Sequence, residues 1–141
     1  MGKSIKFKLI DFATDGYHWV VESMINNQKY WLVVDTGATR TVINQSVIGD
    51  VEIHNHPQGL AIGFESQTTN VNTAILKQIQ IGGINFFDYE VAVADLSNLI
   101  ELYSDMANVT LGGILGCDFL MRNVTSINIQ RKRIYIKNTD D

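Results

Sequence analysis

Apolar and polar residues alternate along much of this chain with a period of two. That period is typical of strands with one buried and one solvent-facing side. In residues 4–10, SIKFKLI, apolar side chains alternate with serine and lysines. Two further apolar runs, 18–25 and 29–35, flank the tripeptide NNQ, so they predict a hairpin that ends at Asp35.

Two more pairs of strand-like segments follow the same rule. Residues 73–81 and 86–96 flank two consecutive glycines, and residues 125–129 and 133–138 flank the tripeptide QRK. Glycine and short polar tripeptides between such runs are typical of tight turns. The pattern therefore predicts two further hairpins.

Helical character is confined to two short stretches, 44–50 and 117–123. A third stretch, 95–111, is compatible with a helix or a loop. The chain contains a single proline and no low-complexity tract that would mark a linker. We therefore expect one all-β domain over residues 1–141, built as a small barrel or folded sheet.

Composition narrows the class of partner. The chain has 141 residues, of which 45% are hydrophobic, so it can build one core. Its net charge is -4 and no basic run is visible, which argues against nucleic acid as the main partner and favours peptides, proteins or small molecules. The single cysteine, Cys117, cannot form an internal disulfide. No membrane span or signal peptide is recognisable, so we expect a cytoplasmic protein without membrane contact.

The candidate chemistry lies where the first hairpin ends. Asp35 follows four bulky apolar residues and precedes Thr36, Gly37 and Ala38. A carboxylate at the end of a buried strand is expensive to desolvate unless a neighbour shares its proton or hydrogen-bonds it. An Asp-Thr-Gly tripeptide by itself is equally compatible with a simple turn after a strand. A second unit, Ile114-Leu115-Gly116, comes directly before the predicted helix 117–123.

Together these two motifs resemble the retropepsin-like aspartic proteases, the family of the retroviral proteases and their bacterial relatives. The resemblance covers nearly the whole chain and implies a small closed β-barrel of acid-protease type with one or two short helices. Pepsin-like enzymes carry two Asp-Thr/Ser-Gly motifs on one chain, whereas this chain carries one. The implied catalyst is therefore a homodimer that pairs two copies of Asp35 across a two-fold axis. Two close carboxylates share one proton and activate water, so the implied cleavage of peptides or proteins needs no metal and no cofactor.

The resemblance also implies roles for the residues around Asp35. Thr36 would direct its hydroxyl to the partner subunit's loop, and Gly37 would let the chain turn and the substrate approach. Ala38 cannot donate a hydroxyl to the carboxylate, so we expect a pH optimum less acidic than that of pepsin. Supporting the loop from below would be the apolar brace Ile114, Leu115 and Gly116.

A retropepsin also needs a mobile hairpin, the flap, which closes over the substrate. Residues 58–76 fit in place and composition, with Gly63 and Phe64 near the tip, although an ordinary hairpin is the alternative. The stretch 95–111 has no obvious retroviral equivalent. The dimer geometry is therefore the part that the resemblance defines least.

Other conspicuous residues have simpler interpretations. His54 and His56 could face one way on a strand, but no further histidine or cysteine cluster completes a metal site, so we expect exposed loop histidines. Cys117 is expected to be a small buried hydrophobe. Asp118 suits the start of the helix at 117–123 and could pair with Arg40 or Arg122.

Three functional classes remain open at this point. The first is a homodimeric aspartic endopeptidase. The second is a non-catalytic dimeric peptide-binding module on the same fold, with Asp35 as a loop-bracing residue. The third is a monomeric small-ligand β-barrel with a closed cavity and Asp35 at a surface turn.

Overall fold

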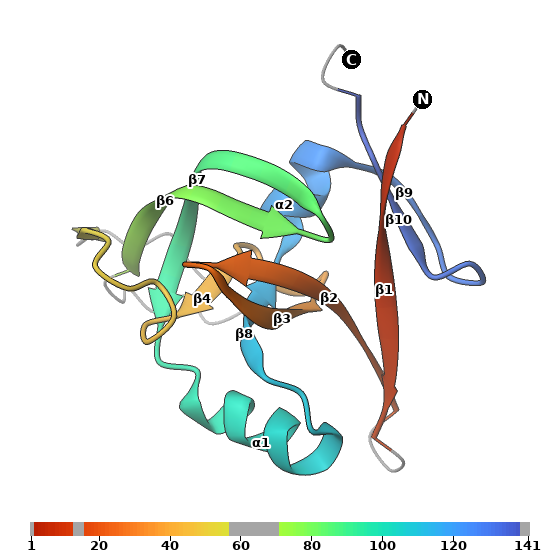
Figure 1. Ribbon diagram of the computed structural model, residues 1–141, viewed down its shortest axis with the longest axis horizontal. Helices are drawn as coiled ribbons and strands as arrows, with labels where there is room; N and C mark the ends of the chain where they lie inside the picture. Colours follow the sequence, from red (N-terminus) through yellow and green to blue (C-terminus); the bar gives the residue numbers. More distant parts are fainter. Residues whose placement is uncertain (1, 13–15, 57–70, 139–141) are drawn as a thin grey trace.

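Six strands close into a barrel in the computed structural model, which describes residues 2–12, 16–56 and 71–138 (Figure 1). Around the barrel they follow the order β2 (Tyr17–Ile25), β3 (Gln28–Val34), β8 (Leu111–Leu115), β4 (Val42–Asn44), β7 (Ile84–Ala94) and β6 (Val71–Ile81). The circle closes because the end of β6 pairs with β2, where Ser23 lies opposite Ile81. The predicted all-β barrel is confirmed.

Four strands extend this barrel. β1 (Lys3–Asp11) pairs with β2 and then with β10 (Arg133–Ile136), which pairs in turn with β9 (Val124–Asn128). β5 (Ile53–His56) pairs with β6. The first and last strands are thus antiparallel neighbours within one chain.

The three predicted hairpins, β2–β3, β6–β7 and β9–β10, are all present. Asn26 and Asn27 have φ values of 52° and 63°, and Gly82 and Gly83 have values of 58° and 87°. Two consecutive residues with positive φ match the right-handed twist of the flanking strands, which explains Asn-Asn and Gly-Gly at these turns. At Gly82 a side chain is also sterically excluded, because a Cβ there would lie 2.2 Å from Cγ2 of Ile5.

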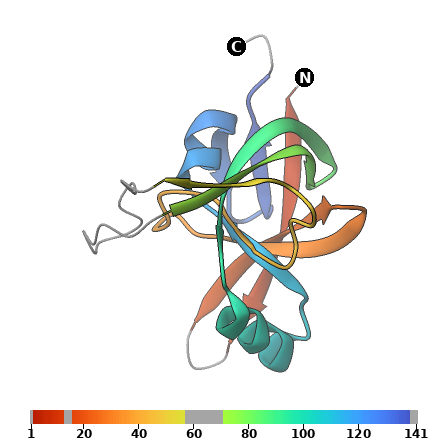
Figure 2. The same cartoon turned by 90° about the vertical axis from the view of Figure 1, so that its left-hand side faces the viewer.

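The barrel interior is filled by apolar side chains from nearly every strand and from α2 (Cys117–Asn123). A second apolar cluster lies between the barrel and α1 (Ser97–Ala107), and it includes Phe12, Val20, Val33 and Tyr103. The two helices lie towards opposite ends of the barrel (Figure 2). Alternate residues of the β2–β3 hairpin therefore serve two different cores, which fixes its register.

The stretch 95–111 contains α1, because its apolar residues recur on one helical face. Tyr103 is buried, and Leu99, Ile100 and Ala107 pack beside it against the second cluster. Helix α2 occupies the predicted residues 117–123. Among the described residues, no helix has the length and apolarity needed to cross a membrane.

The helix predicted at residues 44–50 is wrong. Asn44 ends β4, and its carbonyl accepts the N–H of Val47 to form a turn. Val47 and Ile48 are buried, while Gly49 follows with a φ of 70°. A single turn is enough to bury Val47 and Ile48, so the segment does not need a helix to place its apolar side chains in the core.

Candidate active site

Asp35 stands at the end of a buried strand. Leu32, Val33 and Val34 are at most 9% exposed, whereas Asp35 is exposed. The backbone N–H of Asp35 donates to the carbonyl of Leu115 at 3.0 Å, which continues the parallel pairing of β3 with β8. The buried strand thus ends with Asp35 at the surface, and the bond to Leu115 fixes the backbone of Asp35 there.

The loop after Asp35 turns back on that carboxylate. The N–H of Gly37 donates to Oδ1 of Asp35 at 2.8 Å, and the N–H of Ala38 donates to the Asp35 carbonyl at 3.2 Å. A Cβ on Gly37 would lie 3.2 Å from Oδ1, closer than most side chains tolerate. The φ of Gly37 is not positive, so glycine provides room beside the carboxylate here rather than a left-handed turn.

The junction of β8 and α2 holds this loop from beneath. The N–H of Cys117 donates to the Ala38 carbonyl at 2.8 Å. The thiol of Cys117 donates to the Thr36 carbonyl, with 2.9 Å between Sγ and the oxygen. A Cβ on Gly116 would lie 2.5 Å from the Arg40 backbone, so only glycine fits. Cys117 is half-buried and hydrogen-bonded, which corrects the expectation of a buried, purely apolar residue.

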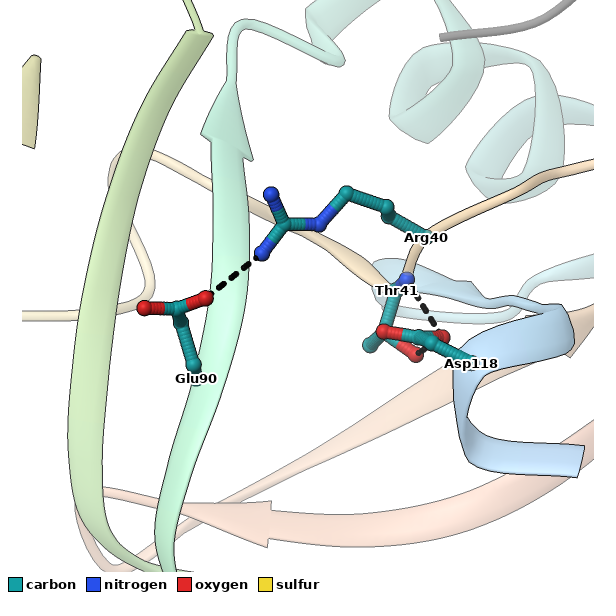
Figure 3. Close-up of polar contacts among 4 residues, drawn as sticks. All are labelled: Arg40, Thr41, Glu90 and Asp118. Atoms are coloured by element: carbon teal, nitrogen blue, oxygen red, sulfur yellow. Dashed lines mark hydrogen bonds and ion pairs between the residues drawn. The ribbon is translucent and has the colours of Figure 1, made fainter. Parts of the chain in front are cut away.

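Thr41 links the two motifs (Figure 3). Its buried hydroxyl accepts the N–H of Gly116 at 3.1 Å and donates to Oδ1 of Asp118 at 2.8 Å. The same Oδ1 accepts the backbone N–H groups of Thr41 at 2.9 Å and of Phe119 at 2.8 Å. Asp118 therefore joins the start of α2 to the loop of Asp35.

Arg40 points away from this network towards β7, where it forms an ion pair with Glu90 at 2.9 Å. The expected pairing of Asp118 with Arg40 or Arg122 is absent among the described residues. The reason is local: Oδ1 of Asp118 already accepts three hydrogen bonds from neutral groups. Such charge-assisted bonds satisfy a partly buried carboxylate without a cation.

Beside Asp35 the surface opens into a pocket of about 370 Å³. Its walls are apolar and aromatic, and Asp35 is the only acid among them: Tyr17, His18, Trp19, Val33, Val34, Asp35, Thr36, Leu99, Tyr103 and Ile114. Two of these residues, Leu99 and Tyr103, come from α1. The helix without an obvious retroviral equivalent therefore forms one wall of the pocket at the carboxylate.

Tyr103 fixes that wall. Its hydroxyl lies 2.6 Å from Nδ1 of His18, and Phe12 packs edge-on against both rings. Burial raises the pKa of Tyr103 to about 12, and the negative charge of Asp35 adds to the increase. The phenol is therefore neutral and available for hydrogen bonding throughout the physiological range.

The predicted site residues separate into two groups. Asp35, Thr36, Gly37 and Ala38 form one loop, and the unit 114–116 lies directly beneath it through Leu115 and Gly116, while Ile114 lines the pocket. The predicted flap residues Gly63 and Phe64 lie outside the described residues.

Sequence reasoning missed Thr41, His18 and Tyr103. The one available signal was at Thr41, a hydroxyl residue six positions after Asp35 and directly before the apolar residues Val42 and Ile43. Among the described residues, no group of three or more His, Cys, Asp or Glu side chains is placed to hold a metal ion.

Comparison with known proteins agrees with this geometry. A family model described as aspartyl protease matches residues 21–119, well over half of the chain. The crystal structure of a retropepsin-like aspartic protease from Rickettsia conorii superposes with a TM-score of 0.54 at 17% sequence identity, covering 96% of this chain and 93% of that one. A search of curated proteins finds no match. The chain belongs to the aspartyl protease family and has the retropepsin-like fold.

Proposed function

We propose that the protein is a homodimeric aspartic endopeptidase in which each subunit contributes Asp35. The observation that carries this proposal is the exposed carboxylate of Asp35 at the end of a buried strand, where it is the only acid among the described residues that line its pocket. Water activation by carboxylates needs two of them, because one must act as base while the other donates a proton. A second copy of the chain would supply the second carboxylate through an isologous interface.

The reaction follows from a shared proton. Two carboxyl groups a few ångströms apart cannot both ionise, so the pair carries one proton and titrates as a unit. The ionised group takes a proton from water as the water oxygen bonds to the peptide carbonyl carbon, and the protonated group donates to the carbonyl oxygen. Proton transfer to the amide nitrogen then breaks the C–N bond and releases acid and amine products.

The loop is built to hold one carboxylate still for this exchange. The Gly37 N–H fixes Oδ1, while the backbone on either side is hydrogen-bonded to Leu115 and Cys117. The Thr36 hydroxyl makes no hydrogen bond within the described part of the chain. It is therefore available to bond the partner's loop, as the family resemblance implies.

The pocket beside Asp35 indicates the substrate side chain. Leu99 and Ile114 line it with apolar surface, and Tyr103 closes it with a phenol whose hydroxyl is already bonded to His18. A pocket whose walls are mainly apolar and aromatic, with few fixed polar groups, favours a large apolar side chain. We place such a side chain next to the scissile bond.

The test is cleavage of a mixed peptide library by the wild type and by Asp35→Asn, across a range of protein concentrations. The wild type should cleave next to large apolar residues, and its rate per subunit should rise with concentration in parallel with dimer formation in sedimentation. Asp35→Asn should lose at least about a thousandfold in rate, since it removes both the base and the acid. Cleavage that persists in Asp35→Asn, or full specific activity in a monomer, would refute the dyad. Binding without cleavage would support the peptide-binding module instead.

A further inference from the structure

A second open pocket, of about 450 Å³, lies away from Asp35, at the point where β1 changes partners. β1 pairs with β10 over Lys3–Lys6 and with β2 over Phe7–Asp11. Figure 1 shows β1 along the right-hand side of the molecule, with β9 and β10 beside its upper half, while β2 lies beside its lower end and diverges from it upwards. The divergence of these two pairings opens the corner.

Four cations surround this corner: Lys6, Lys8, Lys132 and Arg133. Glu22, the only acid among the described residues that line it, already forms an ion pair with Lys29 at 3.1 Å. None of the four cations forms an ion pair with any other described residue. Four cations from segments more than 120 positions apart thus lie together in a chain whose net charge is -4. Such an arrangement costs stability, because like charges repel each other.

The pocket also has an aromatic wall. Trp31 is half-buried, and Nζ of Lys8 and of Lys29 lie 5.6 and 5.1 Å from the centre of its ring. Leu9 also lines the pocket and is 37% exposed. Lys29 also pairs with Glu22, whereas Lys8 lies over the indole and forms no ion pair with another described residue, which leaves the charge of Lys8 available to a ligand.

The backbone of β1 is available here too. The last hydrogen bond towards β10 runs from the Phe7 N–H to the Lys132 carbonyl at 3.1 Å. Beyond it, residues 8–10 pair with a strand on one edge only, the β2 edge, among the described residues. An open strand edge can be completed by another peptide backbone, but not by a free anion.

We infer that this corner binds an extended acidic segment of a polypeptide, which adds to the open edge of β1. Lys6 and Lys8 are two residues apart on one strand, so they share a face and are separated by about 7 Å. Acidic residues at alternate positions of an extended peptide have the same spacing. A second copy of this corner is disfavoured as the occupant, because two identical cationic patches repel each other.

The test uses Asp35→Asn protein, so that binding is measured without cleavage and independently of the proposed function. The probe is a fluorescent eight-residue peptide of alternating Glu and Val, with the Gln-Val peptide as its neutral control. At about 50 mM salt the acidic peptide should bind, and added salt should weaken it. Adding Lys6→Gln and Lys8→Gln should weaken binding about tenfold, whereas the charge-matched pair Lys77→Gln and Arg122→Gln should change it less than twofold.

Hydrogen exchange tests the strand addition separately. Bound peptide should protect the backbone amide of Leu9, which faces the open edge because N–H groups alternate along a strand and that of Phe7 faces β10. It should leave the amides of β4 unchanged, since β4 pairs with β7 and β8 and not with β1. Equal binding of the neutral peptide, equal binding by the Lys6/Lys8 variant, or no gain in amide protection would overturn the proposal. Binding of inorganic phosphate, an oligonucleotide or anionic lipid vesicles in place of the acidic peptide would overturn it as well.

Discussion

Replacing Thr41 by Val removes one hydroxyl and changes almost nothing else, since the two side chains have nearly the same shape. That hydroxyl is buried between the two motifs, where it accepts from Gly116 and donates to Asp118. In Thr41→Val, the Gly116 N–H loses its acceptor and Asp118 loses one of three donors. The backbone bond from the Thr41 N–H to Asp118 remains.

The size of the effect follows from these two losses. A hydrogen bond to a charged group contributes about 1.5–3 kcal/mol, and a buried N–H without a partner costs about 1–3 kcal/mol. Partial relaxation keeps the two from adding fully, so we expect the free energy of unfolding to fall by about 3 kcal/mol. That is a large share of the roughly 5–15 kcal/mol of a whole domain.

Urea unfolding followed by circular dichroism measures the change, with Thr125→Val as the matched control. Thr125 is exposed on β9 and donates over a longer 3.3 Å to the Tyr135 carbonyl, so its loss should lower the unfolding free energy by less than about 0.5 kcal/mol. Combining Thr41→Val with Asp118→Ala should give a coupling energy of about 1–2 kcal/mol. Additive single and double variants, or equal effects at positions 41 and 125, would refute the proposed link between the motifs.

Three further expectations concern the pocket and its pH dependence. Burial holds the pKa of Tyr103 and of Tyr89 at about 12 against an ordinary 10, so each neutral phenol stabilises the fold fully below pH 10 and loses this stabilisation as pH rises towards 12. Tyr103→Phe should lower the free energy of unfolding by about 1 kcal/mol at neutral pH, because the bond to His18 is lost. Each tyrosine makes the free energy of unfolding fall by about 1.4 kcal/mol per pH unit in this alkaline range, so removing one of the two should roughly halve the slope. An unchanged slope in urea unfolding at several pH values would contradict this. Leu99→Ala should enlarge the pocket, so kcat/KM for a Trp peptide relative to that for a Leu peptide should rise about tenfold. Competition assays with the two peptides measure this ratio, and an unchanged ratio would contradict the prediction. Ala38→Ser should move the acid limb of the pH–rate profile to lower pH, because a hydroxyl can stabilise the carboxylate, and a wild-type optimum already near pH 2 would count against that reasoning.

The strands could be predicted from sequence because their signals are local. Alternating side chains mark β1, and the Asn-Asn and Gly-Gly turns mark two hairpins at positions where positive φ is required. The prediction of a helix at 44–50 was wrong because the structure of this segment does not depend on local signals. Its burial is decided by contacts with distant residues, including the bond from Asn26 to the Val47 carbonyl.

The site could be predicted only in part. Asp35 and the unit 114–116 were recognisable as motifs, yet the residues that connect them belong to no motif. Thr41 and Asp118 are 77 positions apart, and His18 and Tyr103 are 85 apart. Only the parallel pairing of β3 with β8 and the packing of α1 bring these partners together. The basic corner was equally hidden, because its cations come from both ends of the chain.

The terminal strands bear on how two subunits could meet. β1 and β10 pair with each other inside one chain, so the edges that they share are not available to a second subunit. The proposed dimer would therefore use surfaces near Asp35, where Asp35, Thr36 and Gly37 are all exposed although the strand before them is buried. Since α1 forms one wall of the adjacent pocket, it is well placed to contribute both to substrate binding and to the interface. On this view, a substitution on the exposed side of α1, such as Met106→Glu at a side chain 60% exposed, should weaken dimerisation in sedimentation without unfolding the subunit. Unchanged dimerisation would place the interface elsewhere around Asp35.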